Sequence, residues 1–263
     1  MITDLLVHLA SKQLEKKGSV VVEGEKLDLL IGSRPLEQDP SLDQEEKEAV
    51  KANVMELLKK YYDMEEEDFL SAELEIVPAG KARDCGLDRS MVLAYGQDDR
   101  VCAYTALTAE IDTKKPEHTT VTILTDKEET GSDGNTGLNS DYVLHYIEDL
   151  ASMEKVAVRD VLKASLCLSS DVNAAYDPTF PDVYEARNSS YINKGCVLTK
   201  YTGARGKGGS NDASAETMAK VIGIMEDAGV YWQAGELGAV DAGGGGTIAK
   251  FVAHMDVDTV DLG

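Results

Sequence analysis

The feature that most constrains the fold is an alternation of strand-like and helix-like segments that begins near residue 90. A short apolar strand is predicted at 91–95 and a helix at 98–111, and the β-branched run TTVTILT predicts a strand at 119–125. The pattern continues with strands at 164–169, 196–201 and 259–262 and a helix at 214–227 that Gly229 ends. Alternation of this kind predicts an α/β sheet with helices on its faces.

The segment before residue 85 has a different character. Apolar residues at helical spacing predict a helix over 3–17 with Thr3 as its N-cap, and two short strands are expected at 20–22 and 27–31. The alternating sequence AELEIV predicts a half-buried strand at 72–77.

A second helix in this segment is marked by a capping box. Ser41 and Gln44 have the spacing of that motif, and the apolar stripe that follows predicts a helix as far as Tyr62. The change of pattern places a domain boundary near residue 85, which gives two domains, 1–85 and 86–263.

Composition excludes several classes of partner. The chain has 263 residues, with 26 Lys and Arg against 48 Asp and Glu, so its formal net charge is −22. Such acidity argues against nucleic acid and against an anionic membrane as partners, because both would repel the chain. No apolar stretch reaches the ~20 residues of a membrane span, and the first residues lack the pattern of a secretory signal. A cytoplasmic location is therefore expected.

Three acidic motifs follow predicted strands. Asp98 comes after the strand at 91–95, Glu128 and Glu129 come after TTVTILT, and Asp171 comes after SLCLSS. Ligands of open α/β sheets bind outside the carboxyl ends of the strands, so these side chains are expected at one edge. Carboxylates gathered in this way repel one another, and a bound cation offsets the repulsion.

Each motif also has an ordinary structural explanation. Asp98 is a normal N-cap for a helix, a Glu-Glu pair is normally solvated, and Asp171 could cap a turn before Asn173. The joint pattern favours a metal site. Successive residues point in different directions, so one glutamate can ligate a metal while its neighbour takes a proton from the attacking water.

Five stretches together resemble the aspartyl aminopeptidase / aminopeptidase I family. They occur in order along most of the chain: ELEIVPAGKARDCGLDRSMVLAYGQDDRVCAYT, DKEETGSDGNTG, SSDVNAAYDP, NKGCVLTKYTGARGKGGSNDASAE and GELGAVDAGGGGTIA. The resemblance implies a two-zinc exopeptidase that hydrolyses N-terminal residues from peptides. It also implies a zinc-exopeptidase-like α/β catalytic domain, and a β-rich dimerisation domain of which residues 1–85 would be part. Members assemble into homo-oligomers, typically dodecamers built from dimers.

The resemblance also implies roles for individual residues. By motif, Asp98 matches the carboxylate that bridges two Zn²⁺ ions, Glu129 a ligand of one ion, and Asp171 a ligand of the other. Glu128 matches the general base. Gly246 and Thr247 match a substrate-side loop. Mn²⁺ or Co²⁺ are alternatives to zinc.

The chain departs from the family pattern in its histidines. The family takes one histidine ligand from a motif ahead of the dimerisation domain and another after the strand that ends in DLG, and neither is found here. The sequence therefore resembles the family without its front and its tail. None of the four histidines present (His8, His118, His145 and His254) is an obvious substitute. Oxygen ligands alone suit magnesium, manganese or calcium better than zinc.

These departures leave other functions open. The chain could be a catalytically incompetent remnant that acts only as a folded assembly module. A phosphate cradle at GGGGT is a third interpretation, although no GK[ST] follows it. Lys200 and Arg205 are candidate groups for binding an acidic substrate residue, or ordinary solvated loop charges.

Overall fold

The chain divides into two compact units at Val77. The computed structural model describes residues 1–36 and 46–263, and the units are Met1–Val77 and Pro78–Gly263. The division lies before the boundary predicted near residue 85, in the extended stretch that leads to the first hairpin of the second unit.

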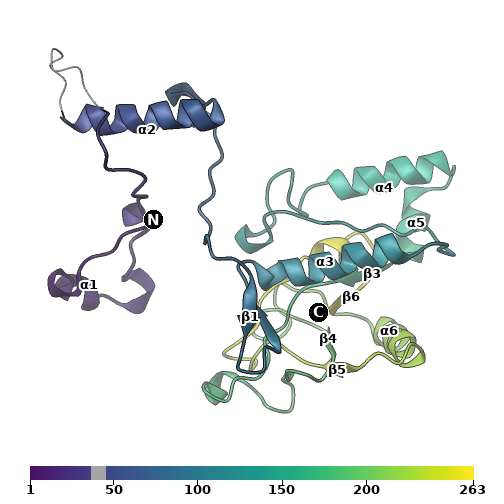
Figure 1. The fold of residues 1–263 in the computed structure, drawn as a ribbon. Helices are drawn as coiled ribbons and strands as arrows, with labels where there is room; N and C mark the ends of the chain where they lie inside the picture. The colour runs from purple at the N-terminus through teal and green to yellow at the C-terminus, as the bar shows by residue number, and fades with distance from the viewer. Residues whose placement is uncertain (37–45) are drawn as a thin grey trace. The chain divides into compact units, whose positions relative to one another are not determined.

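The first unit is dominated by one long helix, α2 (Glu46–Tyr62), shown in blue in Figure 1. Its remaining elements are short: η1 (Val7–Leu9), α1 (Ser11–Leu14), η2 (Gly18–Val20), η3 (Gly24–Lys26) and η4 (Glu66–Leu70). The helix predicted to end at Tyr62 is confirmed. The capping box of Ser41 and Gln44 lies outside the described residues.

The other predictions for this unit are wrong. The helix predicted over 3–17 is limited to η1 and α1, the strand at 20–22 is replaced by η2 and bends, and 72–77 has no strand. The segment 27–31 contributes only the isolated bridge between Ile2 and Leu29. The predicted elements do not form because the apolar side chains of these segments are exposed and do not pack against a hydrophobic core. Helices and strands this short depend on such packing.

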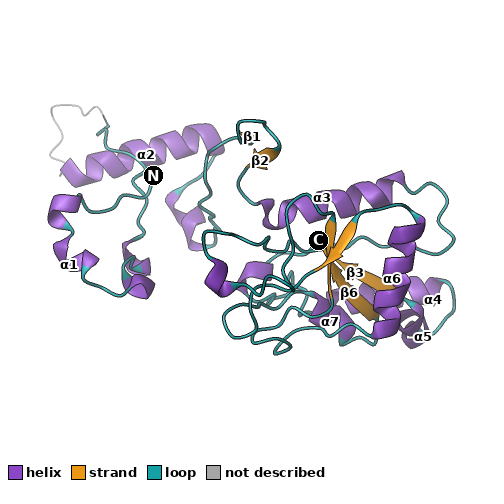
Figure 2. Ribbon diagram, turned by 90° about the horizontal axis from the view of Figure 1, so that it is seen from below, coloured by secondary structure: helices purple, strands orange, loops and turns teal. Residues whose placement is uncertain are grey.

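The second unit contains the predicted α/β sheet. Its strands are arranged in the order β3 (Leu166–Ser169), β6 (Asp258–Leu262), β4 (Cys196–Thr199) and β5 (Trp232–Ala234). The pairs β3–β6 and β4–β5 are parallel, and β4–β6 is antiparallel. A separate hairpin joins β1 (Arg83–Cys85) to β2 (Met91–Leu93). Figure 2 shows the strands in orange among the surrounding helices.

Helices pack on both faces of this sheet. The helices of this unit are α3 (Gln97–Asp112), α4 (Tyr142–Met153), α5 (Val158–Ala164), α6 (Ala215–Asp227) and α7 (Ala249–Ala253), with short η5 (Glu128–Thr130) and η6 (Pro181–Val183). One core cluster joins α4, α5 and α7, and Cys167 packs against it, whereas Leu166 packs against a second cluster that contains α6. Adjacent strand residues point to opposite faces, so the two clusters lie on opposite sides of the sheet.

The strand predicted at 119–125 is not formed. The segment is extended, and Thr120 and Thr122 both donate hydroxyl hydrogen bonds to the Glu110 carboxylate, at 2.6 and 3.3 Å. Alternate side chains therefore point the same way, as in a strand. No backbone hydrogen bond joins this segment to another described residue, so the ladder that would make it a strand is absent from that part of the chain.

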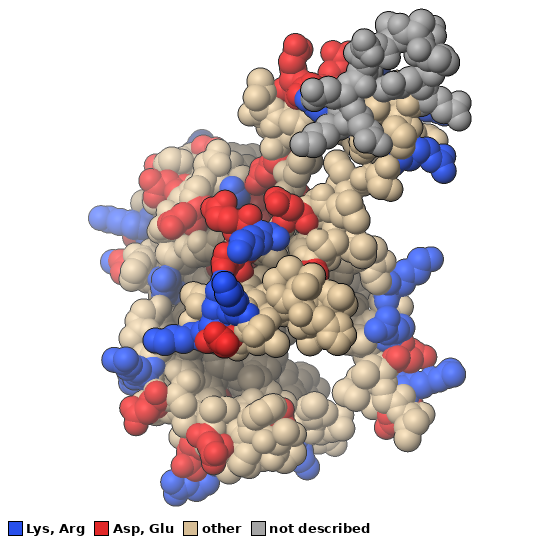
Figure 3. All heavy atoms as spheres, turned by 90° about the vertical axis from the view of Figure 1, so that its left-hand side faces the viewer, with Lys and Arg blue, Asp and Glu red and all other residues tan. Residues whose placement is uncertain are grey.

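The surface carries both signs of charge despite the net charge of −22. On the face in Figure 3, Lys and Arg side chains are interspersed with Asp and Glu rather than gathered in one patch. Within residues 1–36 and 46–263, no helix has both the length and the apolar character needed to cross a membrane.

Candidate metal centre

Four predicted carboxylates lie along one cavity of the second unit. Asp98 stands in the first turn of α3, Glu128 and Glu129 begin η5, and Asp171 follows β3. All four line a cavity of about 390 Å³ and also an adjoining cavity of about 350 Å³. The three segments that precede these residues therefore deliver acidic groups to one place, as the sequence predicts.

The tightest group of carboxylates includes a residue that the sequence analysis did not single out. One carboxylate oxygen each from Asp98, Asp99 and Asp171 lies within 4.8 Å of the others. Asp98 and Asp99 have non-helical backbone angles inside α3, so they do not follow the helical geometry that would separate their side chains. The sequence signal for Asp99 was its place beside Asp98, and the local backbone was not predictable.

The electrostatics of this cluster reflect burial and mutual repulsion. Burial, together with the carboxylates of Asp99, Glu128 and Asp98, raises the pKa of Asp171 to about 7. Burial also raises the pKa of Glu128, and the charges of Glu129, Asp98 and Asp99 add to this effect. Carboxylates clustered in this way retain protons when no metal is bound. A divalent cation that replaces these protons relieves the repulsion between the carboxylates. The donor set therefore fits a divalent cation.

The last two glycines of the run at 243–246 line the 390 Å³ cavity. Gly246 and Thr247 line this cavity together with Asp98 and Asp171. Gly244 has a φ of +93°, and a Cβ there would lie 2.4 Å from the carbonyl oxygen of Gly203. Only glycine permits that close approach of two loops. The run therefore serves to place Thr247 beside the carboxylates.

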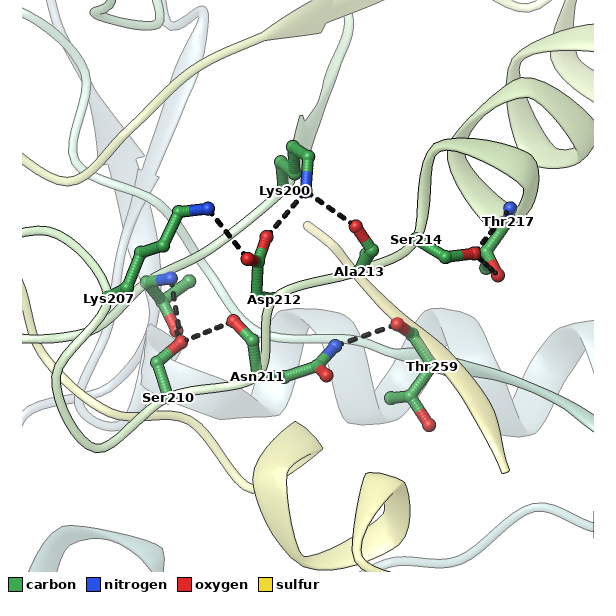
Figure 4. A network of polar contacts seen from close by, with 10 residues as sticks. Lys200, Lys207, Ser210, Asn211, Asp212, Ala213, Ser214, Thr217 and Thr259 are labelled. Carbon is green, nitrogen blue, oxygen red and sulfur yellow. Dashed lines mark hydrogen bonds and ion pairs between the residues drawn. The ribbon is translucent and has the colours of Figure 1, made fainter. Parts of the chain in front are cut away.

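Lys200 is held by hydrogen bonds rather than free to bind a substrate. Its Nζ donates to Asp212 Oδ1 at 2.5 Å and to the Ala213 carbonyl at 2.7 Å, and Lys207 Nζ donates to Asp212 Oδ2 at 2.6 Å (Figure 4). Asn211 Nδ2 then donates to the Thr259 carbonyl of β6. This network fastens the 203–212 loop to the sheet. Arg205 does not line either cavity beside the carboxylates.

The histidines lie away from the carboxylates. His8 is in η1, His118 precedes the extended segment, His145 is in α4, and His254 follows α7. None of the four lines the two cavities. The close group of Asp98, Asp99 and Asp171 therefore offers oxygen ligands, whereas the thiols of Cys102 and Cys167 line the 350 Å³ cavity.

An α/β sheet whose strand ends gather carboxylates at one cavity is an arrangement typical of metal-dependent hydrolases. Comparison with known proteins defines the family. The profile of the aminopeptidase I zinc metalloprotease family, M18, matches residues 1–263, and the chain belongs to that family.

Two bacterial relatives illustrate the similarity. The chain is 53% identical over 266 residues to a probable M18 family aminopeptidase 1 of Clostridium acetobutylicum, and 45% identical over 267 residues to one of Thermotoga maritima. The alignments cover 100% of this chain but only 56% and 57% of the relatives. The chain thus spans little more than half of their length.

Solved structures confirm the fold. The crystal structure of aminopeptidase I from Clostridium acetobutylicum matches with a TM-score of 0.88 over 100% of this chain and 56% of that one. The structure of the Thermotoga maritima M18 aminopeptidase matches with a TM-score of 0.90 over 99% of this chain and 57% of that one. The mixed α/β class predicted from the sequence is therefore confirmed.

Proposed function

We propose that this chain carries the carboxylate part of a two-zinc aminopeptidase centre that hydrolyses N-terminal residues from peptides. The observation that carries the proposal is the convergence of Asp98, Glu128, Glu129 and Asp171 on one cavity. Membership of a zinc metalloprotease family supports zinc as the metal.

Each carboxylate has a proposed role. Asp98 would be a ligand shared by two ions, Glu129 would hold one of them, and Asp171 would hold the other. Asp99 shares the tightest carboxylate group, and so adds negative charge beside Asp98 and Asp171. When bound, zinc polarises the scissile carbonyl and acidifies the attacking water.

Glu128 is proposed as the general base. Its carboxylate lines both cavities, and its raised pKa brings it closer to the range in which a base works at neutral pH. A carboxylate oxygen of Glu128 takes a proton from the attacking water and then transfers it to the leaving amine. Gly246 and Thr247 form the substrate-side wall, and the cavity between them and Glu128 accommodates the peptide's N-terminal residue.

The test compares two neighbouring glutamates. Zinc binding is measured by calorimetry, and hydrolysis is measured with aminoacyl-anilide substrates. Glu128→Gln should retain zinc binding and lose about 10²–10⁴-fold in turnover, because only the base is removed. Glu129→Gln should instead weaken zinc binding. The proposal fails if added zinc neither binds nor supports hydrolysis, and if Glu128→Gln changes nothing.

A second candidate function is a folded assembly module without catalysis. None of the four histidines lines either cavity, and the close group of Asp98, Asp99 and Asp171 offers oxygen alone, whereas zinc prefers nitrogen and sulfur ligands; this favours the alternative. Zinc binding without turnover in the native sequence would support this alternative.

Homo-oligomer formation is part of the proposal. The first unit exposes many large apolar side chains, including Leu6, Leu9 and Ile31, and such surfaces mark interfaces. A yeast structure with the same fold, at 22% identity and a TM-score of 0.61, is described as an mApe1 dodecamer. We assign residues 1–85 to part of a dimerisation domain on these grounds.

A further inference from the structure

Asp261 lies at the centre of a buried polar row in the sheet. It is the cross-strand partner of Ser169 in β3 and of Thr199 in β4, and directly opposed residues point to the same face of a sheet. All three side chains are almost completely buried. Buried polar groups cost free energy unless they find partners, so a row of them inside a sheet calls for an explanation.

Asp261 joins this row to the substrate-side loop. Its Oδ1 accepts the hydrogen bond from Thr247 Oγ1 at 2.7 Å. Burial raises the pKa of Asp261, and the hydroxyls of Thr247 and Ser169 oppose that effect. The Ser169 hydroxyl has no regular hydrogen bond among the described residues, but it is near enough to act on the carboxylate. Asp261 therefore contacts the loop on one side and β3 on the other.

The segment that carries Asp171 is attached to the same row. Ser169 precedes Asp171 by two residues, and Asn173 follows it by two. Asn173 donates a hydrogen bond from Nδ2 to Thr199 Oγ1 at 3.0 Å. The backbone between them lies directly against the residue that follows β6, because a Cβ at Gly263 would collide with the carbonyl oxygen of Asp171. Asp171 thus has little freedom to move without displacing the end of β6.

The end of β6 therefore contacts two walls of the proposed site. Asp261 binds Thr247, and Gly263 packs against Asp171. Leu262, which lies between them, packs on the α6 cluster at the opposite face and so fixes the strand end. A chain of packed and hydrogen-bonded contacts of this kind is able to carry a shift from one wall to the other.

Charge supplies the force on Asp171. Asp98 and Asp99 each place a carboxylate oxygen within 4.8 Å of one from Asp171, and like charges at this distance repel one another. A bound cation removes the repulsion, so the Asp171 segment should pack more firmly against Gly263 when the metal is present. The loop at Thr247 should then become more ordered as well.

We propose that Asp261 is a positioning residue that couples the metal ligand Asp171 to the substrate-side loop, so that neutralising the acidic cluster orders that loop. The inference rests on the proposed function for the role of the metal. Its consequence for hydrolysis is that the wall formed by Gly246 and Thr247 takes its place only after the metal is bound.

Amide hydrogen exchange of residues 245–248 in the 263-residue chain measures the coupling. Two independent changes neutralise the cluster, namely excess zinc and Asp171→Asn without metal. Each should slow exchange at least about fivefold, the lower end of ordinary coupling between sites. Amides of α4 serve as the internal reference. Because the Asp171→Asn arm needs no metal, it decides the coupling even if zinc does not bind, a result that would count against the proposed function alone.

Variants separate positioning from stability. Thr247→Val and Asp261→Val remove the hydrogen bond from either side, and each should abolish the slowing. Asp261→Asn keeps an acceptor oxygen and should retain it. Val221→Ala is the control for stability alone, since Val221 is buried in the α6 cluster on the opposite face; this variant should be less stable but retain the slowing. If Asp261→Val does not fold, Thr247→Val tests the same bond.

Four results would overturn the proposal. One is unchanged exchange in the native loop after both ways of neutralising the cluster. Another is slowing that persists in Thr247→Val, because the coupling would then bypass Asp261. Loss of the slowing in Val221→Ala would reduce the effect to general stability. Loss in Asp261→Asn would show that the acceptor oxygen is not what matters.

Discussion

Thr247 donates a hydrogen bond from Oγ1 to Oδ1 of Asp261 at 2.7 Å. Asp261 is 3% exposed and lies in β6, whereas Thr247 follows the glycine run that lines the cavity. The bond therefore anchors the proposed substrate-side loop to a central strand of the sheet. It also supplies a donor to a carboxylate whose pKa is raised by burial.

Removing this donor should destabilise the protein. Thr247→Val keeps the shape of the side chain but leaves the Asp261 oxygen without that partner, and the expected loss is about 1–3 kcal/mol in the free energy of unfolding. Thr247→Ser retains the hydroxyl and should lose less than about 1 kcal/mol. Urea denaturation measures both. Equal losses in the two variants would show that the methyl group, and not the bond, is what matters.

Zinc binding should compete with protons at Asp171. Because the pKa of this carboxyl is raised to about 7, the metal-free protein is largely protonated there at pH 6 and largely ionised at pH 8. Zinc affinity should therefore rise up to about tenfold per pH unit below 7 and level off above it. Calorimetry at several pH values measures this slope.

The control for this prediction is Asp171→Asn. The variant should bind zinc more weakly and lose the step near pH 7. An unchanged pH slope in Asp171→Asn would assign the competing proton to another group.

Glu236 should make the protein less stable as pH rises. Burial raises its pKa to about 7 from the ordinary 4.5, so the folded state binds this proton more tightly than the unfolded state. Its contribution to stability is full below about pH 4.5, falls between pH 4.5 and 7, and is constant above. Since the side chain is half-buried, Glu236→Gln should gain only about 1–2 kcal/mol at pH 8 relative to its effect at pH 4.

Asp212 provides a control of opposite sign. Hydrogen bonds from Lys200 and Lys207 lower the pKa of Asp212, so its contribution is present above about pH 4 and is lost on acidification. Asp212→Asn should thus destabilise the protein at pH 8 and have little effect at low pH. Thermal unfolding across the pH range compares the two variants.

Self-association should depend on the first unit. Leu6 and Leu9 are 63% and 72% exposed, and changing both to Asp should weaken self-association. The comparison covers about a hundredfold range of protein concentration, because association depends on concentration. Leu87→Asp alters a leucine of the second unit that is still more exposed, and it should leave self-association unchanged. Sedimentation velocity measures the distribution of species. A monomer at every concentration would contradict the assignment of an interface to this unit.

The sequence predicted those elements that have a partner within the second unit. The strands at 164–169, 196–201 and 259–262 are confirmed as β3, β4 and β6, and each pairs with a neighbour. The β-branched run at 119–125 has as strong a local pattern, yet it forms no ladder with any residue that the structure describes. Strand formation depends on a partner that is often distant in sequence, and local propensity does not reveal whether such a partner is available.

The same limit applies to the first unit and to the site. The leucines of the segment 3–17 have helical spacing, but they gain little from folding because they remain exposed. At the site, acidic residues after strands were predictable because parallel strands end at one edge. The proximity of Asp99 to Asp171 was not, since it depends on backbone angles in the first turn of α3.

Leu198 and Leu168 offer a direct measure of where the core lies. Leu198 in β4 is fully buried and packs with Val221 and Val260, whereas Leu168 in β3 is 48% exposed at the free edge. Leu198→Ala should cost about 2–5 kcal/mol in the free energy of unfolding, because it leaves a cavity inside the α6 cluster. Leu168→Ala should cost less than about 1 kcal/mol in the chain alone. Chemical denaturation compares the two. A loss at Leu168 as large as that at Leu198 would show that the β3 edge is already covered in solution.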